Sequence, residues 1–175
     1  MKPVTVKARI FAALGTAIFL LVAPGTFAVA IPWWISRWHV HASFPGFTAI
    51  RIAGALLITA AAVFVMETFL RFALQGIGTP APIAPTMRLV VTGSYRYVRN
   101  PMYIAVVSLV LGQGLLFGNA GVLMYGLCAW LATHLFVVFY EEPTLQRSFP
   151  DDYRTFSAHV PRWLPRLTPW NGHGA

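Results

Sequence analysis

Long apolar runs constrain this chain more than any other feature, because a helix needs about 20 consecutive apolar residues to cross a bilayer. Four runs approach that length, and they cover residues 10–34, 47–74, 102–117 and 122–140. Charged residues make up 10% of the chain, whereas soluble globular domains carry roughly 25%. We therefore predict an all-α integral membrane helical bundle with about four transmembrane helices, forming a single domain over residues 1–175.

The first run follows a short basic segment, residues 1–9, as the apolar part of a secretory signal peptide does. It is longer than the roughly 7–15 residues of a signal's apolar region, and it continues into Trp33 and Trp34. Tryptophan is enriched at membrane–water interfaces. We therefore interpret the run as a retained first span, which Pro24-Gly25 is expected to kink.

Lysine and arginine are distributed unevenly around the four runs. The N-terminal segment holds three, the connector between the second and third runs together with Arg71 holds four and the C-terminal tail holds four, whereas only two lie between Ser36 and Arg51. Because cytoplasmic segments carry the excess of positive charge, both termini are predicted to be cytoplasmic. This topology, with attraction to anionic lipid headgroups, accounts for the +8 net charge without nucleic acid. The expected partners are the membrane and a lipid or amphipathic small-molecule substrate, with no obligate protein partner.

Few polar residues interrupt the apolar runs. Glu67 and Arg71 lie one helical turn apart, and the spacing fits either a structural ion pair or a functional carboxylate. His39 and His41 lack a third ligand nearby, and the chain has a single cysteine, so no metal site is expected. The fourth run is predicted to end abruptly at Glu141-Glu142-Pro143, and part of the tail is predicted to form an amphipathic helix on the cytoplasmic surface.

One polar cluster stands between the connector and the third run, where residues 92–103 read Thr-Gly-Ser-Tyr-Arg-Tyr-Val-Arg-Asn-Pro-Met-Tyr. Pro101 occupies a position that favours the start of a helix. Arginine at a membrane boundary is costly to desolvate unless an anionic group pairs with it. We therefore predict that the cluster binds a polar ligand with an anionic group.

S-adenosylmethionine fits the residue types near this cluster. Its carboxylate binds a guanidinium or backbone N–H groups, and Arg99 supplies the former. Its ammonium and ribose hydroxyls bind carboxylates, which Glu141 and Glu142 supply. The tyrosines of the cluster offer aromatic walls for adenine. Gly112 and Gly114 are expected to interrupt the third run near its far end and to let a ligand or a neighbouring helix approach the backbone.

His134 lies within the fourth run, seven residues before Glu141 and on the same helix face. Two roles fit this position equally well. One is a proton acceptor or substrate-orienting group near the reaction centre, and the other is a hydrogen-bonded core histidine. The sequence leaves this choice open.

Four segments taken together resemble the isoprenylcysteine carboxyl methyltransferase and phospholipid N-methyltransferase family. They are Gly93 to Tyr103, Gly112-Gln113-Gly114, Glu141-Glu142 and Tyr153 to Pro165, and the resemblance covers about residues 80–169. It implies a small helical membrane methyltransferase that binds S-adenosylmethionine on the cytoplasmic side, between the Arg-Asn-Pro-Met-Tyr segment, the helical hairpin and the folded-back tail. The methyl acceptor would be a lipid-like or amphipathic substrate.

The resemblance and the residue chemistry together define an expected site. Catalytic roles are predicted for Arg99, His134 and Glu142. The predicted cofactor-binding residues are Val90, Tyr95, Arg99, Asn100, Pro101, Met102, Tyr103, Gly112, Gly114, Glu141, Glu142 and Arg162. By resemblance, Trp163 belongs with Arg162 to the tail that closes over the site.

Two positions depart from the family pattern. Asn100 stands where eukaryotic members commonly have a histidine, and asparagine cannot titrate, so proton transfer is not expected there. Val137 and Val138 stand where the prenylcysteine enzymes have an arginine that faces the substrate carboxylate. The difference favours another lipid-like nucleophile over strict prenylcysteine carboxyl methylation.

The residues leave several alternatives open. The acceptor atom is a carboxylate oxygen, a phospholipid amine or a small thiol. In a different class of function, the scaffold resembles NADPH-dependent sterol-type reductases, although their larger number of spans is missing here. A non-enzymatic membrane scaffold would use the same charges for topology alone.

Overall fold

A computed structural model describes residues 15, 18, 21–40, 46–75, 89 and 91–172, with the side chains of residues 71–75 left out. The basic N-terminal segment, the side chain of Arg71 and the predicted cofactor residue Val90 lie outside this part of the chain. Every regular element in the described part is helical, in agreement with the all-α prediction.

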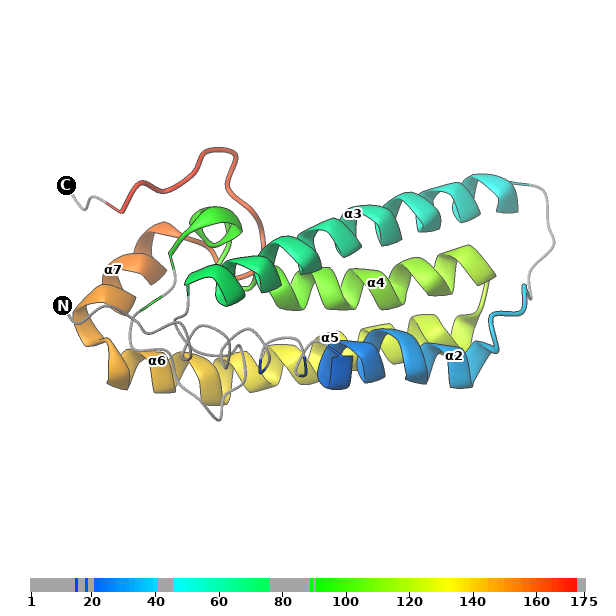
Figure 1. Ribbon diagram of the computed structural model, residues 1–175, viewed down its shortest axis with the longest axis horizontal. Helices are drawn as coiled ribbons and strands as arrows, with labels where there is room; N and C mark the ends of the chain where they lie inside the picture. Colours follow the sequence, from blue (N-terminus) through cyan, green and yellow to red (C-terminus); the bar gives the residue numbers. More distant parts are fainter. Residues whose placement is uncertain are drawn as a thin grey trace.

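Three long helices lie side by side along the longest axis of the molecule (Figure 1). They are α3 (Phe47–Gln75), α4 (Pro101–Phe117) and α5 (Ala120–Phe136), and α5 continues into α6 (Glu142–Ser148). An apolar helix over Leu21–Ser36 packs beside them; it contains a π-helical turn at Thr26–Ala30 and ends with α2 (Ile31–Ser36). The last helix, α7 (Pro150–His159), lies at one end of the bundle.

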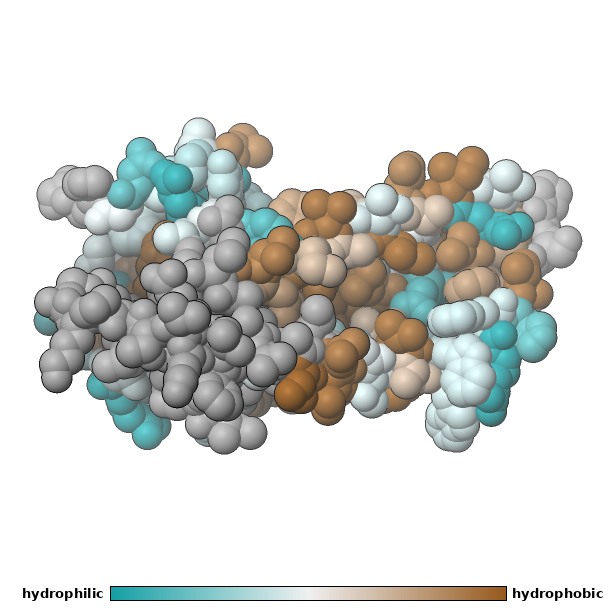
Figure 2. All heavy atoms as spheres, viewed as in Figure 1, coloured by the Kyte–Doolittle hydropathy of each residue, from teal (hydrophilic) through white to brown (hydrophobic). Residues whose placement is uncertain are grey.

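Two of these helical stretches are long and apolar enough to cross a membrane: Phe47–Leu70 and Ala120–Ser148. Only 17% and 22% of the residues in their apolar windows are buried inside the protein, so most of their apolar side chains face outward. Figure 2 shows the resulting apolar surface over the middle of the molecule, with polar residues towards the ends. The other two predicted spans correspond to shorter apolar helices, Leu21–Ser36 and Pro101–Phe117.

Glycines bring α3, α4 and α5 into close contact. A Cβ atom on Gly54 of α3 would lie 2.7 Å from the carbonyl oxygen of Gly112 on α4, and one on Gly114 would lie 2.5 Å from Leu123 of α5. Such small residues allow helix backbones to approach closely in membrane bundles. The prediction that Gly112 and Gly114 interrupt the third run is wrong, because α4 continues through both of them to Phe117.

The turn between α4 and α5 agrees with the sequence prediction. Gly118 ends α4 with a φ of 61°, a backbone conformation that glycine adopts without strain. Asn119 then caps α5, because its side-chain oxygen accepts a hydrogen bond from the backbone N–H of Val122 at 3.0 Å. The two helices therefore form a tight antiparallel hairpin.

The fourth run does not end at Glu141-Glu142-Pro143 as predicted. It passes through a π-helical turn at Val137–Glu141 and continues as α6 to Ser148. A proline in a helix interior lacks an N–H donor and clashes with the carbonyl four residues earlier. Here Pro143 occupies the first turn of α6, directly after the wider π-helical turn, so the chain continues in the same direction.

The predicted amphipathic helix in the tail is α7. Its inner face buries Tyr153 and Phe156, which form an apolar cluster with Val160. Leu89 and Val91, from the connector before α4, pack against the same cluster, so the connector and the tail lie together. The outer face of α7 is exposed and polar.

Candidate active site

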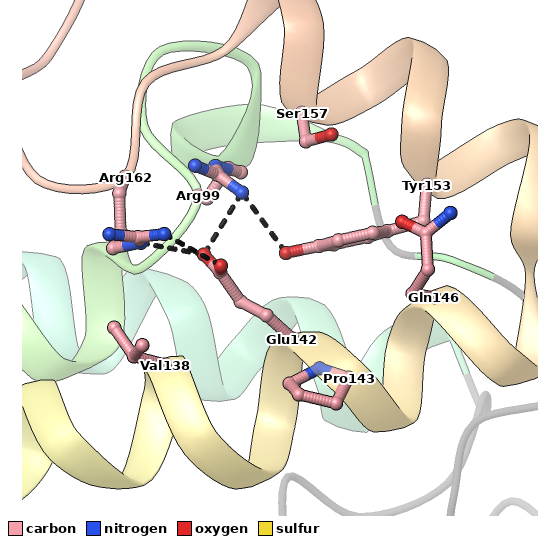
Figure 3. Close-up of a pocket in the computed structure, with 8 residues that line it drawn as sticks. All are labelled: Arg99, Val138, Glu142, Pro143, Gln146, Tyr153, Ser157 and Arg162. Carbon is pink, nitrogen blue, oxygen red and sulfur yellow. Dashed lines mark hydrogen bonds and ion pairs between the residues drawn. The ribbon is translucent and has the colours of Figure 1, made fainter.

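A pocket of about 430 Å³ opens where the start of α4, the end of the α5–α6 helix, α7 and the tail meet. Its walls carry three charged side chains and five others, shown as sticks in Figure 3: Arg99, Val138, Glu142, Pro143, Gln146, Tyr153, Ser157 and Arg162. The volume is within the range of small-molecule binding sites, roughly 300–1,000 Å³.

Glu142 is the centre of this pocket. Its Oε1 lies 2.9 Å from Nη1 of Arg99 and 2.7 Å from Nε of Arg162. Arg162 makes a two-pronged contact, because its Nη2 also donates to Oε2 of Glu142 at 2.8 Å. The hydrogen bond to Glu142 raises the pKa of Arg162. Arginine side chains are charged in proteins. Two positive charges against one negative charge leave the pocket with an excess of positive charge.

Arg99 is held from two sides. Its Nη1 donates to the hydroxyl of Tyr153 at 3.0 Å as well as contacting Glu142, and its side chain is only 13% exposed. Burial raises the pKa of Tyr153 to about 12, so the phenol stays neutral and accepts this bond near neutral pH. The Nε of Arg99 is buried and has no hydrogen-bond partner among the described residues. Buried donors are seldom left unpaired, so this atom is suited to an incoming acceptor.

The tail is fastened over the polar cluster by backbone hydrogen bonds. The N–H of Arg99 donates to the carbonyl of Pro161 at 3.0 Å, and the N–H of Arg166 donates to the carbonyl of Tyr97 at 2.9 Å. Asn100 is buried, and its side-chain amide donates to the carbonyl of Arg162 at 3.1 Å. Asn100 therefore holds the residue that reaches Glu142, and it does not line the pocket itself.

The adjacent Glu141 belongs to a second polar cluster on another face of the helix. The hydroxyl of Tyr103 donates to Oε2 of Glu141 at 2.8 Å, and nearby the hydroxyl of Ser94 donates to Oε2 of Glu67 at 2.9 Å. Tyr95 is close enough to interact electrostatically with both carboxylates, and its burial raises the pKa of its phenol. Successive residues of a helix point about 100° apart, so Glu141 and Glu142 contact different parts of the protein.

Replacing Tyr103 with phenylalanine is expected to lower the apparent unfolding midpoint by about 3–12 °C. A hydrogen bond to a charged group contributes about 1.5–3 kcal/mol, and about 2–4 °C accompany each kcal/mol in a chain of this size. Thermal unfolding of the detergent-solubilised protein measures it. Tyr125→Phe is the matched control, because the Tyr125 hydroxyl donates to the Phe27 carbonyl in an exposed, uncharged contact. Equal shifts in the two variants would show that the Tyr103–Glu141 bond has no special weight.

His134 lies along the same helix towards the middle of the bundle. Its Nδ1 is 3.0 Å from Nε1 of Trp163, and because an indole nitrogen only donates, Nδ1 is the acceptor. The imidazole stacks on Trp130 at 5.6 Å and contacts the Trp163 ring at 5.8 Å. His134 therefore binds the tail directly and does not line the pocket.

The structure brings together only some of the residues predicted for the site. Arg99, Glu142 and Arg162 share the pocket, whereas Tyr95, Tyr103 and Glu141 form the second cluster. Pro101 is buried at the start of α4 and Met102 packs against the core residues Val65, Phe69 and Ala105. Gly112 and Gly114 meet side chains of α3 and α5, so neighbouring helices fill the space beside them.

Sequence reasoning missed several pocket residues that helical spacing indicates. Gln146 lies four residues after Glu142, and Ser157 lies four residues after Tyr153, so each shares a helix face with a charged or polar partner. Val138, which the resemblance placed where the prenylcysteine enzymes have an arginine, lies four residues before Glu142 and forms an apolar wall of the pocket. No group of three or more metal-binding side chains exists among the described residues.

Comparison with protein families assigns the chain. The family model for phospholipid methyltransferases matches residues 49–152, more than half of the sequence. This protein belongs to the phospholipid methyltransferase family. It is therefore a membrane methyltransferase that uses S-adenosylmethionine, and the sterol-reductase and non-enzymatic alternatives are not retained. No curated protein matches the chain.

The part matched to the phospholipid methyltransferase family begins in α3 and ends just before Tyr153. Arg99 and Glu142 lie inside it, and Tyr153, Ser157 and Arg162 lie beyond its end. The pocket therefore joins the matched helical bundle to a tail that is outside the match.

Proposed function

We propose that this protein transfers the methyl group of S-adenosylmethionine, held in the pocket around Arg99 and Glu142, to the head group of a lipid-like substrate. The observation that carries the proposal is the position of a positively charged pocket beside lipid-facing helices. Val138 forms one wall of the pocket, and the neighbouring Phe139 is 75% exposed on the outer surface of the same helix. A substrate with an apolar part in the bilayer can therefore approach the polar pocket from the side.

The pocket fits the charged end of the methyl donor. The excess positive charge suits its carboxylate, and the unpartnered Nε of Arg99 is a buried donor available to it. When bound, S-adenosylmethionine supplies an electrophilic methyl group on sulfur. The protein's own residues then bind and orient the two substrates and exclude water.

The hydrogen bonds in the site bear on which acceptor is used. Glu142 is already bound by two arginines, and His134 accepts at Nδ1, so in the neutral imidazole the remaining proton is on Nε2. Neither of these predicted proton acceptors is free. The described part of the site thus favours an acceptor that reaches it unprotonated, after losing any proton to water.

A phospholipid-type amine is the acceptor we favour, because the family match points to phospholipids. A small or lipophilic thiol is the second candidate, because a cysteine thiol ionises at about pH 8.5, nearly two units below the lysine amine, and a thiol of that acidity depends less on a protein base. A prenylcysteine carboxylate is the least supported. Val137 is fully buried and Val138 is apolar, so neither supplies the arginine that the prenylcysteine enzymes have there.

The proposed orientation places the pocket on the cytoplasmic side. The four apolar helices would cross the bilayer with both termini in the cytoplasm, as the arginine distribution predicts. The connector before α4 and the tail after α6 would then share one face, where S-adenosylmethionine is available.

Methyl transfer in lipid nanodiscs tests this function. Purified protein is given S-adenosylmethionine labelled in the methyl group and one of three acceptors: dioleoylphosphatidylethanolamine, dodecanethiol or farnesylcysteine. We expect label in the phosphatidylethanolamine fraction, with dodecanethiol as the next best acceptor. Labelling of farnesylcysteine alone would contradict the acceptor assignment, and bound cofactor without transfer to any of the three would contradict the lipid-like class.

The contact between His134 and Trp163 gives a separate prediction. Trp163→Phe keeps the ring and removes the donor, so kcat/KM should fall about 2- to 10-fold, as expected for one neutral hydrogen bond of about 0.5–1.5 kcal/mol. His134→Ala should lower it by a similar factor, and the double variant should be no worse than either single one. The pH profile of kcat/KM should keep its shape in all three. A profile that loses its acidic limb in His134→Ala would instead identify His134 as a general base.

A further inference from the structure

The bend of the tail, residues 161–170, exposes two leucines. Leu164 is 80% exposed and Leu167 is 99% exposed, which makes them the most exposed large apolar side chains in the described part of the chain. Most of the other strongly exposed apolar side chains lie on the long helices, where the bilayer covers them. We call residues 161–170 the tail bend. It is not part of a membrane-spanning helix, and it still exposes apolar side chains. Figure 2 shows an apolar patch at its outer edge among polar neighbours.

The tail bend is held in place firmly enough to define where these leucines project. Its backbone is bonded at both ends to the strip before α4: Arg99 donates to the Pro161 carbonyl, and the N–H of Trp170 donates to the Arg96 carbonyl at 2.9 Å. The side chain of Arg96 also donates to the Trp170 carbonyl at 2.7 Å. Leu164 and Leu167 therefore lie on a loop with a defined position, and the described residues leave both side chains exposed.

The tail bend lies near the end of the bundle where the apolar surface of α3 stops. The strip that carries it is bonded to α3 through Ser94 and Glu67, and the apolar window of α3 ends three residues later at Leu70, which is 51% exposed. Figure 1 shows the tail bend beside the C-terminal end of α3. The tail bend is thus tied, through this strip, to the part of α3 where the apolar window ends.

The charges beside these leucines select the kind of surface. Arg96 donates to the Trp170 carbonyl and to Asn171, and Nη1 of Arg166 donates to the His159 carbonyl at 2.8 Å. These acceptors are neutral, and neither arginine forms an ion pair within the described residues. Basic side chains next to exposed apolar ones are the combination that binds the interface of an anionic membrane.

We propose that the tail bend is an interfacial anchor. Leu164 and Leu167 insert into the headgroup layer of the bilayer that the protein spans, and Arg96 and Arg166 bind anionic phospholipid headgroups there. Because Arg162 lies in the same bend, this anchor sets the pocket at the depth of a lipid head group. The anchor is a property of the tail and stands independently of the acceptor proposed above.

Spin-label accessibility measures the depth of the tail bend without reference to activity. In a Cys128→Ala background, one label is placed at Leu167→Cys and another at Asp152→Cys, which is exposed on α7 and serves as the water reference. The native Cys128, exposed midway along α5, carries the label that serves as the hydrocarbon reference. Collision with oxygen and with a water-soluble nickel chelate is measured in phosphatidylcholine nanodiscs with and without phosphatidylglycerol.

The label at position 167 should be protected from the nickel chelate at least 3-fold relative to position 152, with oxygen access between the two references. Phosphatidylglycerol should increase this protection, and adding Arg166→Gln should reduce the increase. Chelate access equal to that of position 152 would overturn the anchor. Low access to both reagents would overturn it too, since it indicates cover by protein, such as a second copy. If protection is the same with and without phosphatidylglycerol, the proposed binding of anionic headgroups by Arg96 and Arg166 is wrong.

Discussion

Replacing Arg99 with alanine is expected to lower kcat/KM for methyl transfer by about 100-fold or more. The Arg99 guanidinium contacts Glu142 at 2.9 Å and Tyr153 at 3.0 Å, and its buried Nε has no hydrogen-bond partner among the described residues. A hydrogen bond that involves a charged group contributes about 1.5–3 kcal/mol, and the loss of two such interactions amounts to at least about 3 kcal/mol. Each 1.4 kcal/mol corresponds to about a factor of ten. The loss should appear mainly as weaker binding of S-adenosylmethionine, measured by calorimetry beside the initial rates.

Two variants make this result specific. Arg154→Ala removes an arginine that also forms an ion pair, with Asp151 at 3.1 Å, but that pair is exposed on the outer face of α7. Exposed pairs contribute little, so its kcat/KM should stay within about twofold of the original protein. Arg99→Lys keeps the charge without the planar fork and should recover only part of the loss. If Arg99→Ala and Arg154→Ala had equal activity, the assignment of Arg99 to the active site would be wrong.

The meeting of Arg99 and Glu142 is predictable from sequence because of helix lengths. Helices α4 and α5 each have 17 residues and are joined by a tight turn, so the end of α5 returns to the level of Pro101. Residues beyond that end then come level with residues just before Pro101. When the two helices of a hairpin have equal length, the residue before the first helix and the residues after the second lie at the same end. The hairpin therefore brings Arg99 and Glu142 together.

The sequence does not predict that Glu142 lines the pocket while Glu141 binds Tyr103 in a separate cluster. Glu141 and Glu142 are adjacent, and the sequence treats them as one acidic pair, yet the π-helical turn that ends at Glu141 decides which face each one takes. A π-helical turn has no reliable signature in residue type. The partners come from distant segments, since Tyr103 is on α4 and Arg162 is in the tail.

Gly112 and Gly114 show the limit of a short motif. A Gly-x-Gly pair in an apolar helix predicts a close approach of some other group, and the sequence does not say whether that group is a ligand or a helix. Counting along the helix favours a neighbouring helix over the ligand, because 11 residues of α4 place Gly112 about 16 Å from Pro101, where the helix begins. In the structure, Ile58 of α3 and Leu123 of α5 occupy the space beside these glycines.

That packing predicts the largest effect on stability. Replacing Gly54 with leucine should lower the apparent unfolding midpoint of the detergent-solubilised protein by up to about 12 °C or prevent folding altogether. A Cβ atom there would lie 2.7 Å from the Gly112 carbonyl oxygen and 2.7 Å from the Leu116 nitrogen, both of which are backbone atoms that no rotamer change can move. Overpacking of this kind costs about 1–3 kcal/mol or more, and about 2–4 °C accompany each kcal/mol in a chain of this length.

Ala55→Leu is the matched control, because it adds a large side chain at the next position of the same helix. Ala55 is exposed on the outer face of α3, so the new leucine faces lipid or detergent and the midpoint should change by less than about 2 °C, as for other surface substitutions of about ±0.5 kcal/mol. A variant of Gly54 that unfolds no earlier than Ala55→Leu would mean that α3 and α4 are farther apart than described. Because Ser94 is bonded to Glu67 on α3, separating these helices should also weaken binding of S-adenosylmethionine at the far end of the bundle.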